Sequence, residues 1–381
     1  MKLVYCVDRL FHVGGIEVTT SLKANALVNG GMASVWILYT EQKDATPFTI
    51  SPGVHLVDLG IRYSDNTKPF PWNLICIILK KHRHKNQLTR ALSQIRPDIV
   101  ISTGGQEFRI LPRIKGSWTT LCELHSTKFH KRILAQTWQT RLFARFSEWQ
   151  NYKRTITQYD HIVVLTQEEK GRYWSDWNNV SVIPNPTRFQ PDLPSELLAK
   201  RVLAVGRLSP EKNYSSLIRA FALVHPLFPD WSLDIFGDGD KRNLLLSEIE
   251  DYHLNDVIHL PGSTNDVRKE MLASSLLVCS SKYEGFAMVI LEAMSCGLPV
   301  VSYECPCGPK DLISDEYNGY LVPVGDEITL ADRICRLIEN TERRKQMGLA
   351  ALETSKQFSL ERITSLWMAL FKKLIGEKRH E

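Results

Sequence analysis

Short apolar runs alternate along this chain with longer segments of helical periodicity. In the first half, the runs that predict buried strands are KLVYCVD, ASVWILY, VHLVDL, DIVIST, TTLCELH and HIVVLT. In the second half they are RVLAVG, SLDIFGDGD, VIHLPG, SLLVCSS, LPVVSYE and YLVPVG. Apolar runs of about four to eight residues, separated by helical segments, are typical of parallel sheets joined by crossover helices. The pattern therefore predicts an α/β fold with two sheets of similar size.

The segment SVIPNPTRF separates the two groups of predicted strands. Its two prolines flank Asn185, and neither a helix nor a central strand accommodates them well. A chain of 381 residues is also too long for one ordinary core. We therefore predict two domains, residues 1–184 and 185–381, with the boundary in this linker.

Two glutamates mark a candidate ligand site in the second half. Residues 283–302, YEGFAMVILEAMSCGLPVVS, predict a loop, a helix and the next strand. Glu284 and Gly285 fall in the loop, at the edge where open α/β sheets bind ligands, and Glu292 lies about two turns into the helix. Carboxylates there can accept hydrogen bonds from the hydroxyls of riboses and hexoses. For Glu284 alone, an ordinary surface acid near a helix start is an equal alternative.

A second loop in the same half carries two cations. Residues 201–221, RVLAVGRLSPEKNYSSLIRAF, predict a strand that ends at Gly206, a loop with Arg207 and Lys212, and a helix. Two cations just ahead of a helix N-terminus form a site for a doubly charged anion, because free N–H groups and the helix dipole add to their field. Diphosphate fits that description. Either cation taken singly is more often a solvated surface charge.

These motifs resemble the retaining glycosyltransferases of family 4, which have the GT-B fold. GRLSPEKN is similar to the donor-phosphate motif of that family, and Glu284 and Glu292 match its pair of glutamates separated by seven residues. The stretch CPCGPKDLISDEYNGYLVPVGD continues the likeness, which covers residues 200–330. In the first half it rests on architecture and on the short segment VGGIEV.

The resemblance implies two Rossmann-like, doubly wound domains that face each other across a cleft. Residues 1–184 would bind the acceptor and residues 185–381 the nucleotide sugar. The last helix, predicted within residues 359–376, would cross back to the first domain.

The resemblance also implies roles for individual residues. It assigns Arg207 and Lys212 to the donor diphosphate, Glu284 to hydroxyls of the transferred sugar, and Glu292 to the ribose. His125, at the end of TTLCELH, would contact the transferred sugar and complete the catalytic set, although a histidine that merely caps a strand is nearly as plausible an interpretation.

The remaining substrate-binding candidates are glycines and loop residues. A Gly-Gly pair before a helix lets backbone N–H groups approach a phosphate, although a plain tight turn explains the same pair. Ser263 and Thr264 follow a predicted strand and would lie near the base. With the two residues after Glu284, this group comprises Gly14, Gly15, Gly285, Phe286, Ser263 and Thr264.

The expected chemistry needs neither a metal nor a cofactor. In a same-face transfer of this type, the departing phosphate takes the proton of the acceptor while cations offset its charge. Cys305 and Cys307 form a CxC, but no second pair has zinc-site spacing. The other cysteines are scattered, which favours reduced thiols in a cytoplasmic protein.

Charge divides unevenly between the two predicted domains. The formal net charge is +10 for residues 1–184 and −5 for residues 185–381. Between Asn66 and Pro97 there are seven Lys or Arg and no acid, and residues 128–154 interleave basic and aromatic side chains. This composition predicts peripheral contact with an anionic membrane at its inner face. A solvated basic surface is the alternative, and no nucleic-acid motif is present.

The sequence leads to the hypothesis of a hexosyltransferase that uses a nucleotide diphosphate sugar, with a UDP-sugar as the expected donor. Its expected acceptor is a glycan or a lipid-linked sugar in surface polysaccharide biosynthesis. A sugar-nucleotide epimerase of the same fold and a non-catalytic nucleotide-sugar-binding subunit remain alternatives. A nucleic-acid-binding protein would explain the basic half but not Arg207, Lys212, Glu284 and Glu292 together.

Overall fold

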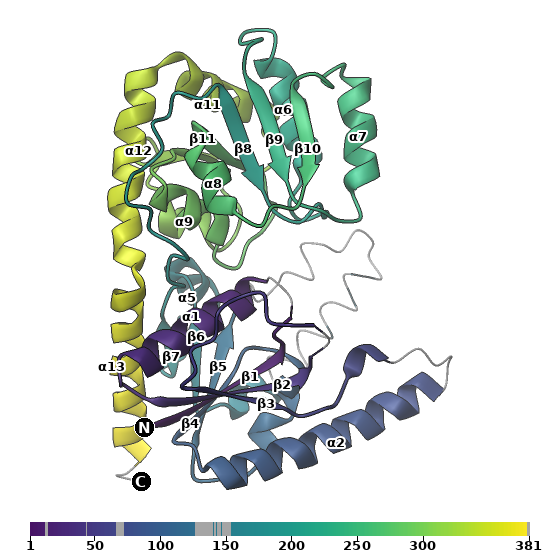
Figure 1. Ribbon diagram of the computed structural model, residues 1–381, viewed down its shortest axis with the longest axis vertical. Helices are drawn as coiled ribbons and strands as arrows, with labels where there is room; N and C mark the ends of the chain where they lie inside the picture. The colour runs from purple at the N-terminus through teal and green to yellow at the C-terminus, as the bar shows by residue number, and fades with distance from the viewer. Residues whose placement is uncertain are drawn as a thin grey trace.

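The alternation of apolar runs and helical segments produces two α/β units stacked end to end (Figure 1). This computed structural model describes residues 1–11, 14–42, 44–65, 72–125, 140, 142, 146 and 154–378. Most of the basic, aromatic stretch at residues 128–154 therefore lies outside the described residues.

The first sheet contains seven parallel strands in the order β3-β2-β1-β4-β5-β6-β7. Parallel strands that are covered on both faces need apolar residues at nearly every position, which is how these runs read in the sequence. The strands are β1 (Lys2–Arg9), β2 (Ser34–Glu41), β3 (Val54–Asp58), β4 (Ile99–Ser102), β5 (Thr119–Leu124), β6 (His161–Val164) and β7 (Val180–Val182).

The second sheet contains six parallel strands in the order β10-β9-β8-β11-β12-β13. In both sheets the order reverses beside the first strand of the unit, so each sheet has a topological switch point where ligands are usually bound. The strands are β8 (Arg201–Val205), β9 (Ser232–Phe236), β10 (Ile258–Gly262), β11 (Leu276–Cys279), β12 (Val300–Tyr303) and β13 (Gly319–Val322).

Helices cover both faces of each sheet. The first unit carries α1 (Gly15–Asn29), α2 (Trp72–Ile95), α5 (Gln167–Tyr173) and the short 3-10 turns η1 (Tyr63–Asp65), η2 (Gln106–Arg109), η3 (Leu111–Arg113) and η4 (Ile156–Gln158). The second carries α6 (Tyr214–Val224), α7 (Arg242–Asp251), α8 (Val267–Leu272), α9 (Met288–Ser295), α10 (Pro309–Leu312), α11 (Glu327–Glu339) and α12 (Thr341–Ser355). In the first unit, α1 packs on one face and α2 on the other, each through buried leucines.

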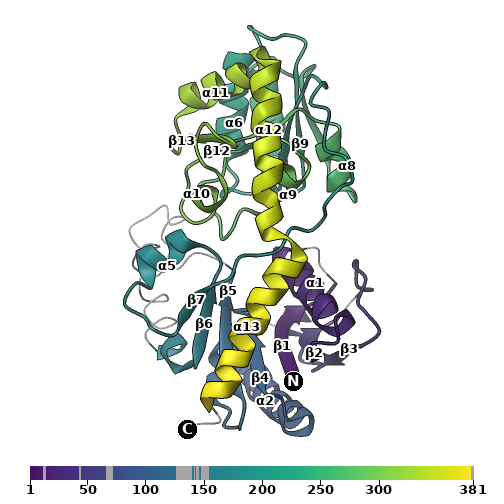
Figure 2. The ribbon, with the colours of Figure 1, turned by 90° about the vertical axis from the view of Figure 1, so that its left-hand side faces the viewer.

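The chain passes between the two units twice. After α12, a 3-10 turn η5 (Lys356–Phe358) leads into α13 (Leu360–Lys378), which crosses back and packs beside α1 on the first sheet (Figure 2). The two passages touch, because the backbone N–H of Thr187 donates to the carbonyl of Phe358 at 2.8 Å. The expected crossover helix at residues 359–376 is therefore present.

One strand differs from the sequence prediction. Residues 180–182, part of which we assigned to the linker, pair with β6 as β7 before Pro184 ends the strand. A strand of three residues is too short to show a periodic pattern in the sequence, and the two prolines that follow it favoured a linker. The domain boundary at 184/185 stays a prediction.

Candidate active site

A cavity of about 690 Å³ lies between the two units, at the carboxyl ends of the strands. Its walls come from the start of α1, the end of β5, the loops that follow β6 to β11, and the start of α9. The cavity brings together the following sequence-predicted site residues: Gly14, Gly15, His125, Arg207, Lys212, Ser263, Glu284, Gly285, Phe286 and Glu292.

The cationic loop begins where β8 ends. Gly206 donates its N–H to the carbonyl of Phe236, and Gly237 crosses directly over Gly206. A Cβ on Gly237 would lie 1.9 Å from the Gly206 carbonyl oxygen, and its φ is +145°, so only glycine permits this crossing. The crossing sets the start of the loop that carries Arg207, whose exposed guanidinium makes no hydrogen bond with the described residues.

Lys212 and Glu284 form an ion pair inside the cavity. The Lys212 Nζ lies 2.6 Å from Oε1 of Glu284, and the Ser281 hydroxyl donates to the same oxygen at 2.6 Å. Burial disfavours the ammonium, but the Glu284 carboxylate, together with Cys279 and Tyr214, outweighs burial and raises the pKa of Lys212. Lys212 is therefore a permanent cation, with ammonium hydrogens to spare for an anionic ligand. The two residues predicted to bind different parts of a donor thus contact each other.

Glu292 has different surroundings. Its carboxylate is buried on α9, and no described side chain forms a hydrogen bond with it. Burial raises its pKa to about 7, and Arg188 only partly offsets that rise. A buried carboxylate without a partner is costly, and hydroxyl donors from a ligand would remove that cost.

Two helices begin at the cavity. Gly14 is the N-cap of α1 and has no side chain to satisfy the first N–H groups, and a Cβ on Gly15 would meet nothing within 4 Å. The Glu17 carboxylate lies against the position of a Gly14 Cβ, so a phosphate or a polar ligand group would approach the first N–H groups of α1 at Gly15. On the opposite side, α9 begins after Ala287, whose φ of +59° turns the chain from Gly285 and Phe286 into the helix.

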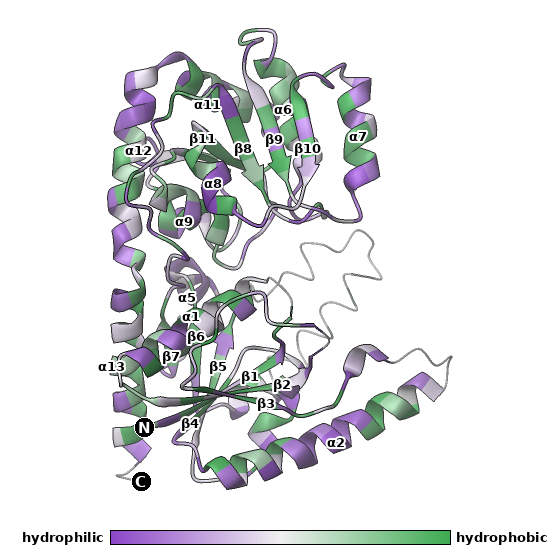
Figure 3. Cartoon of the chain, in the orientation of Figure 1, coloured by the Kyte–Doolittle hydropathy of each residue, from purple (hydrophilic) through white to green (hydrophobic). Residues whose placement is uncertain are grey.

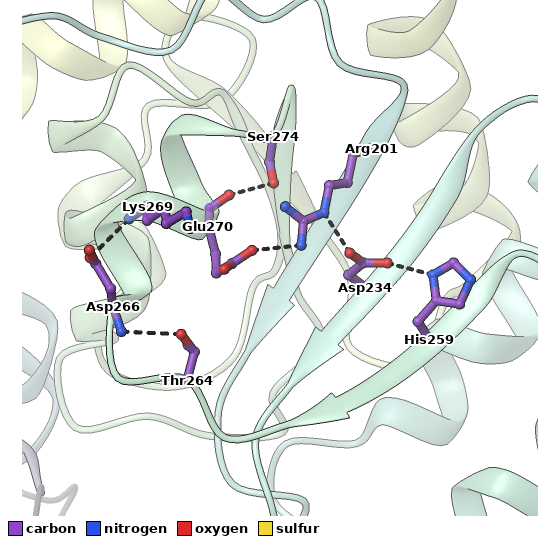
Figure 4. A network of polar contacts seen from close by, with 8 residues as sticks. All are labelled: Arg201, Asp234, His259, Thr264, Asp266, Lys269, Glu270 and Ser274. Carbon is purple, nitrogen blue, oxygen red and sulfur yellow. Dashed lines mark hydrogen bonds and ion pairs between the residues drawn. The ribbon is translucent and has the colours of Figure 1, made fainter.

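His125 and Ser263 line the cavity, whereas Thr264 does not. The Thr264 hydroxyl accepts a hydrogen bond from the N–H of Asp266 at 3.1 Å, so it faces the start of α8 (Figure 4). A network across β8, β9 and β10 stabilises this region, in which Arg201 binds Asp234 at 2.6 Å and Glu270 at 2.8 Å, and Asp234 also binds His259.

Several lining residues were not predicted as site residues. Arg188 and Asn185 belong to the segment that we interpreted as a linker, and Glu211 belongs to the loop that carries Arg207 and Lys212. Arg188 is the important omission, because it adds a third cation beside Glu292. A lone arginine in a proline-rich segment gives no signal of its position. No group of three or more potential metal ligands occurs within the described residues.

Comparisons with known proteins bear on the fold and on the family of the second half of the chain. Residues 188–354 match the family model for glycosyl transferases group 1. The whole chain superposes on a crystal structure of S. aureus TarM in complex with fondaparinux, alpha-GlcNAc-glycerol and UDP, with a TM-score of 0.79 and 17% identity, covering 97% of this chain and 99% of that one. The expected GT-B fold is therefore confirmed, and the second half of the chain is related to group 1 glycosyltransferases.

Curated relatives with higher identity match part of the chain. The amylovoran biosynthesis glycosyltransferase AmsD of Erwinia amylovora is 31% identical over 217 residues, which are 55% of this chain and 61% of that protein. An exopolysaccharide phosphotransferase of Streptomyces coelicolor is 33% identical over 228 residues, 58% of this chain and 24% of that protein. The chain thus spans less than two thirds of the length of either relative.

Proposed function

We propose that the protein is a retaining glycosyltransferase of family 4 that transfers a hexose from a UDP-sugar to a glycan or lipid-linked acceptor in surface polysaccharide biosynthesis. The observation that carries the proposal is the composition of the cavity, which is lined by Arg207 and Lys212, by the start of α1 at Gly15, and by Glu292. These are binding groups for a diphosphate and for vicinal hydroxyls. The relationship to group 1 glycosyltransferases and the UDP in the TarM complex support it.

In the proposed reaction, Arg207 and Lys212 hold the diphosphate as its charge grows, and Glu292 accepts hydrogen bonds from the ribose. Lys212 and Ser281 both bond to Oε1 of Glu284, so Oε2 remains for a hydroxyl of the transferred sugar. The bond from the anomeric carbon to the phosphate oxygen breaks as the bond to the acceptor oxygen forms on the same face. The departing phosphate takes the acceptor proton, which cations favour by stabilising the developing charge.

Mass spectrometry after incubation with UDP-, GDP- and ADP-sugars and a panel of glycan and lipid-linked acceptors tests the proposal. We expect one donor to give a glycosylated acceptor whose new linkage keeps the anomeric configuration of the donor. An inverted linkage would contradict the retaining mechanism. Epimerisation of a sugar nucleotide in the absence of acceptor would contradict the proposed transferase activity. Binding of sugar nucleotides without turnover for every pair of donor and acceptor would contradict it too.

We further propose that the acceptor is reached at an anionic membrane. Helix α2 exposes four large apolar side chains in its first two turns and carries no acid, and its apolar end projects away from the sheet (Figure 3). Trp72 is 61% exposed and Leu79 is 64% exposed, beside Ile75 and Ile78. Apolar groups next to cations are the composition of an interfacial helix. None of the described helices is long and apolar enough to span a membrane.

Co-sedimentation with vesicles separates the contribution of the cations of α2 from that of its exposed apolar side chains. Changing Lys80, Lys81, Arg83 and Lys85 to Gln should reduce binding to anionic vesicles at low salt to the level that wild type shows at high salt, since each well-placed cation contributes about 1 kcal/mol at low salt. Changing Ile75 and Leu79 to Ser should weaken binding at both low and high salt. The control changes Leu223 and Leu227, exposed leucines of the second unit, to Ser. Wild-type protein that ignores anionic vesicles at low salt would contradict the proposal.

A further inference from the structure

The geometry of β5 connects His125 to buried residues of its own sheet. Side chains alternate along a strand, so Leu121, Glu123 and His125 point to the same face. That face is covered by α1 and α13, because Leu121 packs in one core with Leu27 and Trp367. His125 therefore lines the cavity at the end of a row that continues into the core.

Three titratable side chains meet in this row. The Lys23 ammonium of α1 forms an ion pair with Oε1 of Glu123, and Nε2 of His125 lies 3.4 Å from the same oxygen. The side chains of Lys23, Glu123 and His125 are 2%, 1% and 7% exposed. Oε2 of Glu123 and Nε2 of His125 are both buried, and neither has a hydrogen-bond partner among the described residues, so the approach of Nε2 to Oε1 is a close charge contact. Solvent therefore does little to screen this cluster.

Aromatic rings enclose the ammonium. Lys23 Nζ lies 4.6 Å from the ring centroid of Trp367 on α13 and 5.6 Å from that of Tyr5 on β1. The faces of aromatic rings attract cations, so these rings hold the ammonium against Glu123. A buried ion pair contributes little to stability, because a well-packed apolar pair often replaces it without loss. Fold stability therefore does not account for the cluster.

We propose that Lys23 and Glu123 are positioning residues that hold the imidazole of His125 toward the transferred sugar in the cavity. This inference rests on the proposed function. Burial would favour a neutral Glu123, but Lys23 and then His125 outweigh it and hold its pKa at about 2. Glu123 is thus a permanent carboxylate beside Nε2. A carboxylate there favours the tautomer with the proton on Nε2, which leaves Nδ1 to accept a hydrogen bond from a sugar hydroxyl.

The distance of 3.4 Å is long for a hydrogen bond. Catalytic hydrogen bonds often tighten in the complex with substrate. We therefore expect the contact between His125 and Glu123 to shorten in the donor complex, with Lys23 keeping Glu123 in place.

A double-mutant cycle tests the inference. The double variant Lys23→Met with Glu123→Gln removes both charges together, so no buried charge is left without its partner. We expect kcat to fall about tenfold or more, since a small misplacement of a contact group has a large effect on rate. The affinity for UDP, measured by titration calorimetry, should stay within about twofold, because neither residue lines the cavity.

The same double change is then made in a His125→Ala background. If Lys23 and Glu123 act through His125, the double change should lower kcat no further in the His125→Ala background. An equal loss in both backgrounds, or a wild-type kcat in the double variant, would overturn the inference.

A second measurement does not depend on catalysis. Imidazole nitrogen NMR of histidine-labelled protein, with His125→Ala for assignment, should place the His125 proton on Nε2 in the wild type. The double variant should lose that preference. A wild-type proton on Nδ1 would overturn the inference even if the double variant fails to fold. A protein with no transferase activity but the expected tautomer would instead contradict the proposed function.

Discussion

Neighbouring carboxylates in the cavity have unlike partners. Glu284 accepts hydrogen bonds from Lys212 and Ser281, whereas Glu292 is buried with only Arg188 to favour its charge. The charge of Glu284 is stabilised by protein groups, whereas the charge of Glu292 would be stabilised mainly by hydroxyl donors of a ligand. These two residues should therefore respond differently to the same chemical change.

Arg207 and Lys212 should both matter for turnover. Their replacement should, however, affect the thermal stability of the protein differently. Replacing either by Ala should lower transfer by about 10²-fold, because a charge-assisted contact to the departing diphosphate is lost. Arg207→Ala should leave the midpoint of thermal unfolding unchanged, since its guanidinium is exposed. Lys212→Ala should lower that midpoint, because it strips Glu284 of its cation. Near-normal turnover in both variants would refute the donor-site assignment.

Glu292→Gln should make the protein more stable at alkaline pH. The folded carboxyl has a pKa of about 7 against an ordinary value of 4.5, so the folded state binds more protons than the unfolded state between these values. Stability is therefore lost as pH rises through that window. The amide removes this loss, so the gain should reach about 3 kcal/mol at most at pH 8 and vanish near pH 4. Urea unfolding at both pH values measures it, and an equal gain at both would be the contrary outcome.

The two glutamates should also differ in ligand affinity. Glu292→Gln should weaken UDP binding because we assign Glu292 to the ribose, and the weakening should grow as pH rises through about 7. Glu284→Gln should mainly reduce transfer. Calorimetric titration with UDP from pH 6 to 8 compares them, and an equal loss of UDP affinity in both variants would contradict the assignment.

At the scale of elements, the apolar runs of the sequence were enough to predict most of the strands and the site residues that follow them. The strands that deliver Arg207 and Glu284 are continuous apolar runs, so the residues that follow them could be placed at the sheet edge from sequence. Arg188 and Lys23 could not be placed. Arg188 reaches the cavity only because the linker bends across it, and Lys23 looks like a solvated helix residue until α13 covers it. Such positions depend on contacts between distant segments, which no local period encodes.

Trp367 should be the main anchor of α13. It is 1% exposed and packs against Phe371 in the core of the first sheet. Trp367→Ala should lower the free energy of unfolding by about 3–5 kcal/mol through the cavity it leaves. The control is Leu366→Ala, the adjacent residue, which is 42% exposed. Similar losses in denaturant unfolding for the two variants would show that α13 is not anchored through this face.

At the scale of the whole molecule, contacts beside the cavity join the units. Asp311 of α10 accepts hydrogen bonds from the N–H groups of Gln167 and Glu168 at the start of α5. Glu168 in turn accepts a hydrogen bond from the N–H of Cys307 at 2.9 Å. A carboxylate at a helix N-terminus is favourable, so these contacts hold the described arrangement closed.

Asp311→Ala should loosen this arrangement. We expect a larger radius of gyration in small-angle X-ray scattering of the free protein, because the start of α5 loses its acceptor in the other unit. Saturating UDP should reduce the difference if the ligand bridges both walls of the cavity. The matched control is Lys310→Gln on the same helix, whose partner Glu304 lies in its own unit. An unchanged radius in the Asp311 variant would show that other contacts keep the units together.

The crossover helix has a consequence for biosynthesis. Trp367 and Phe371 complete the core of a sheet whose first strand is Lys2–Arg9, whereas the buried apolar residues on the two faces of the second sheet come from residues 197–351, with Leu165 as the one addition. On a ribosome, the unit that is translated first therefore waits for a late helix, while the later unit already has its own core. A released chain that is truncated at residue 358 should hold a protease-resistant second unit next to a protease-sensitive first one. Production of active protein would then depend on how long that incomplete sheet stays protected from aggregation.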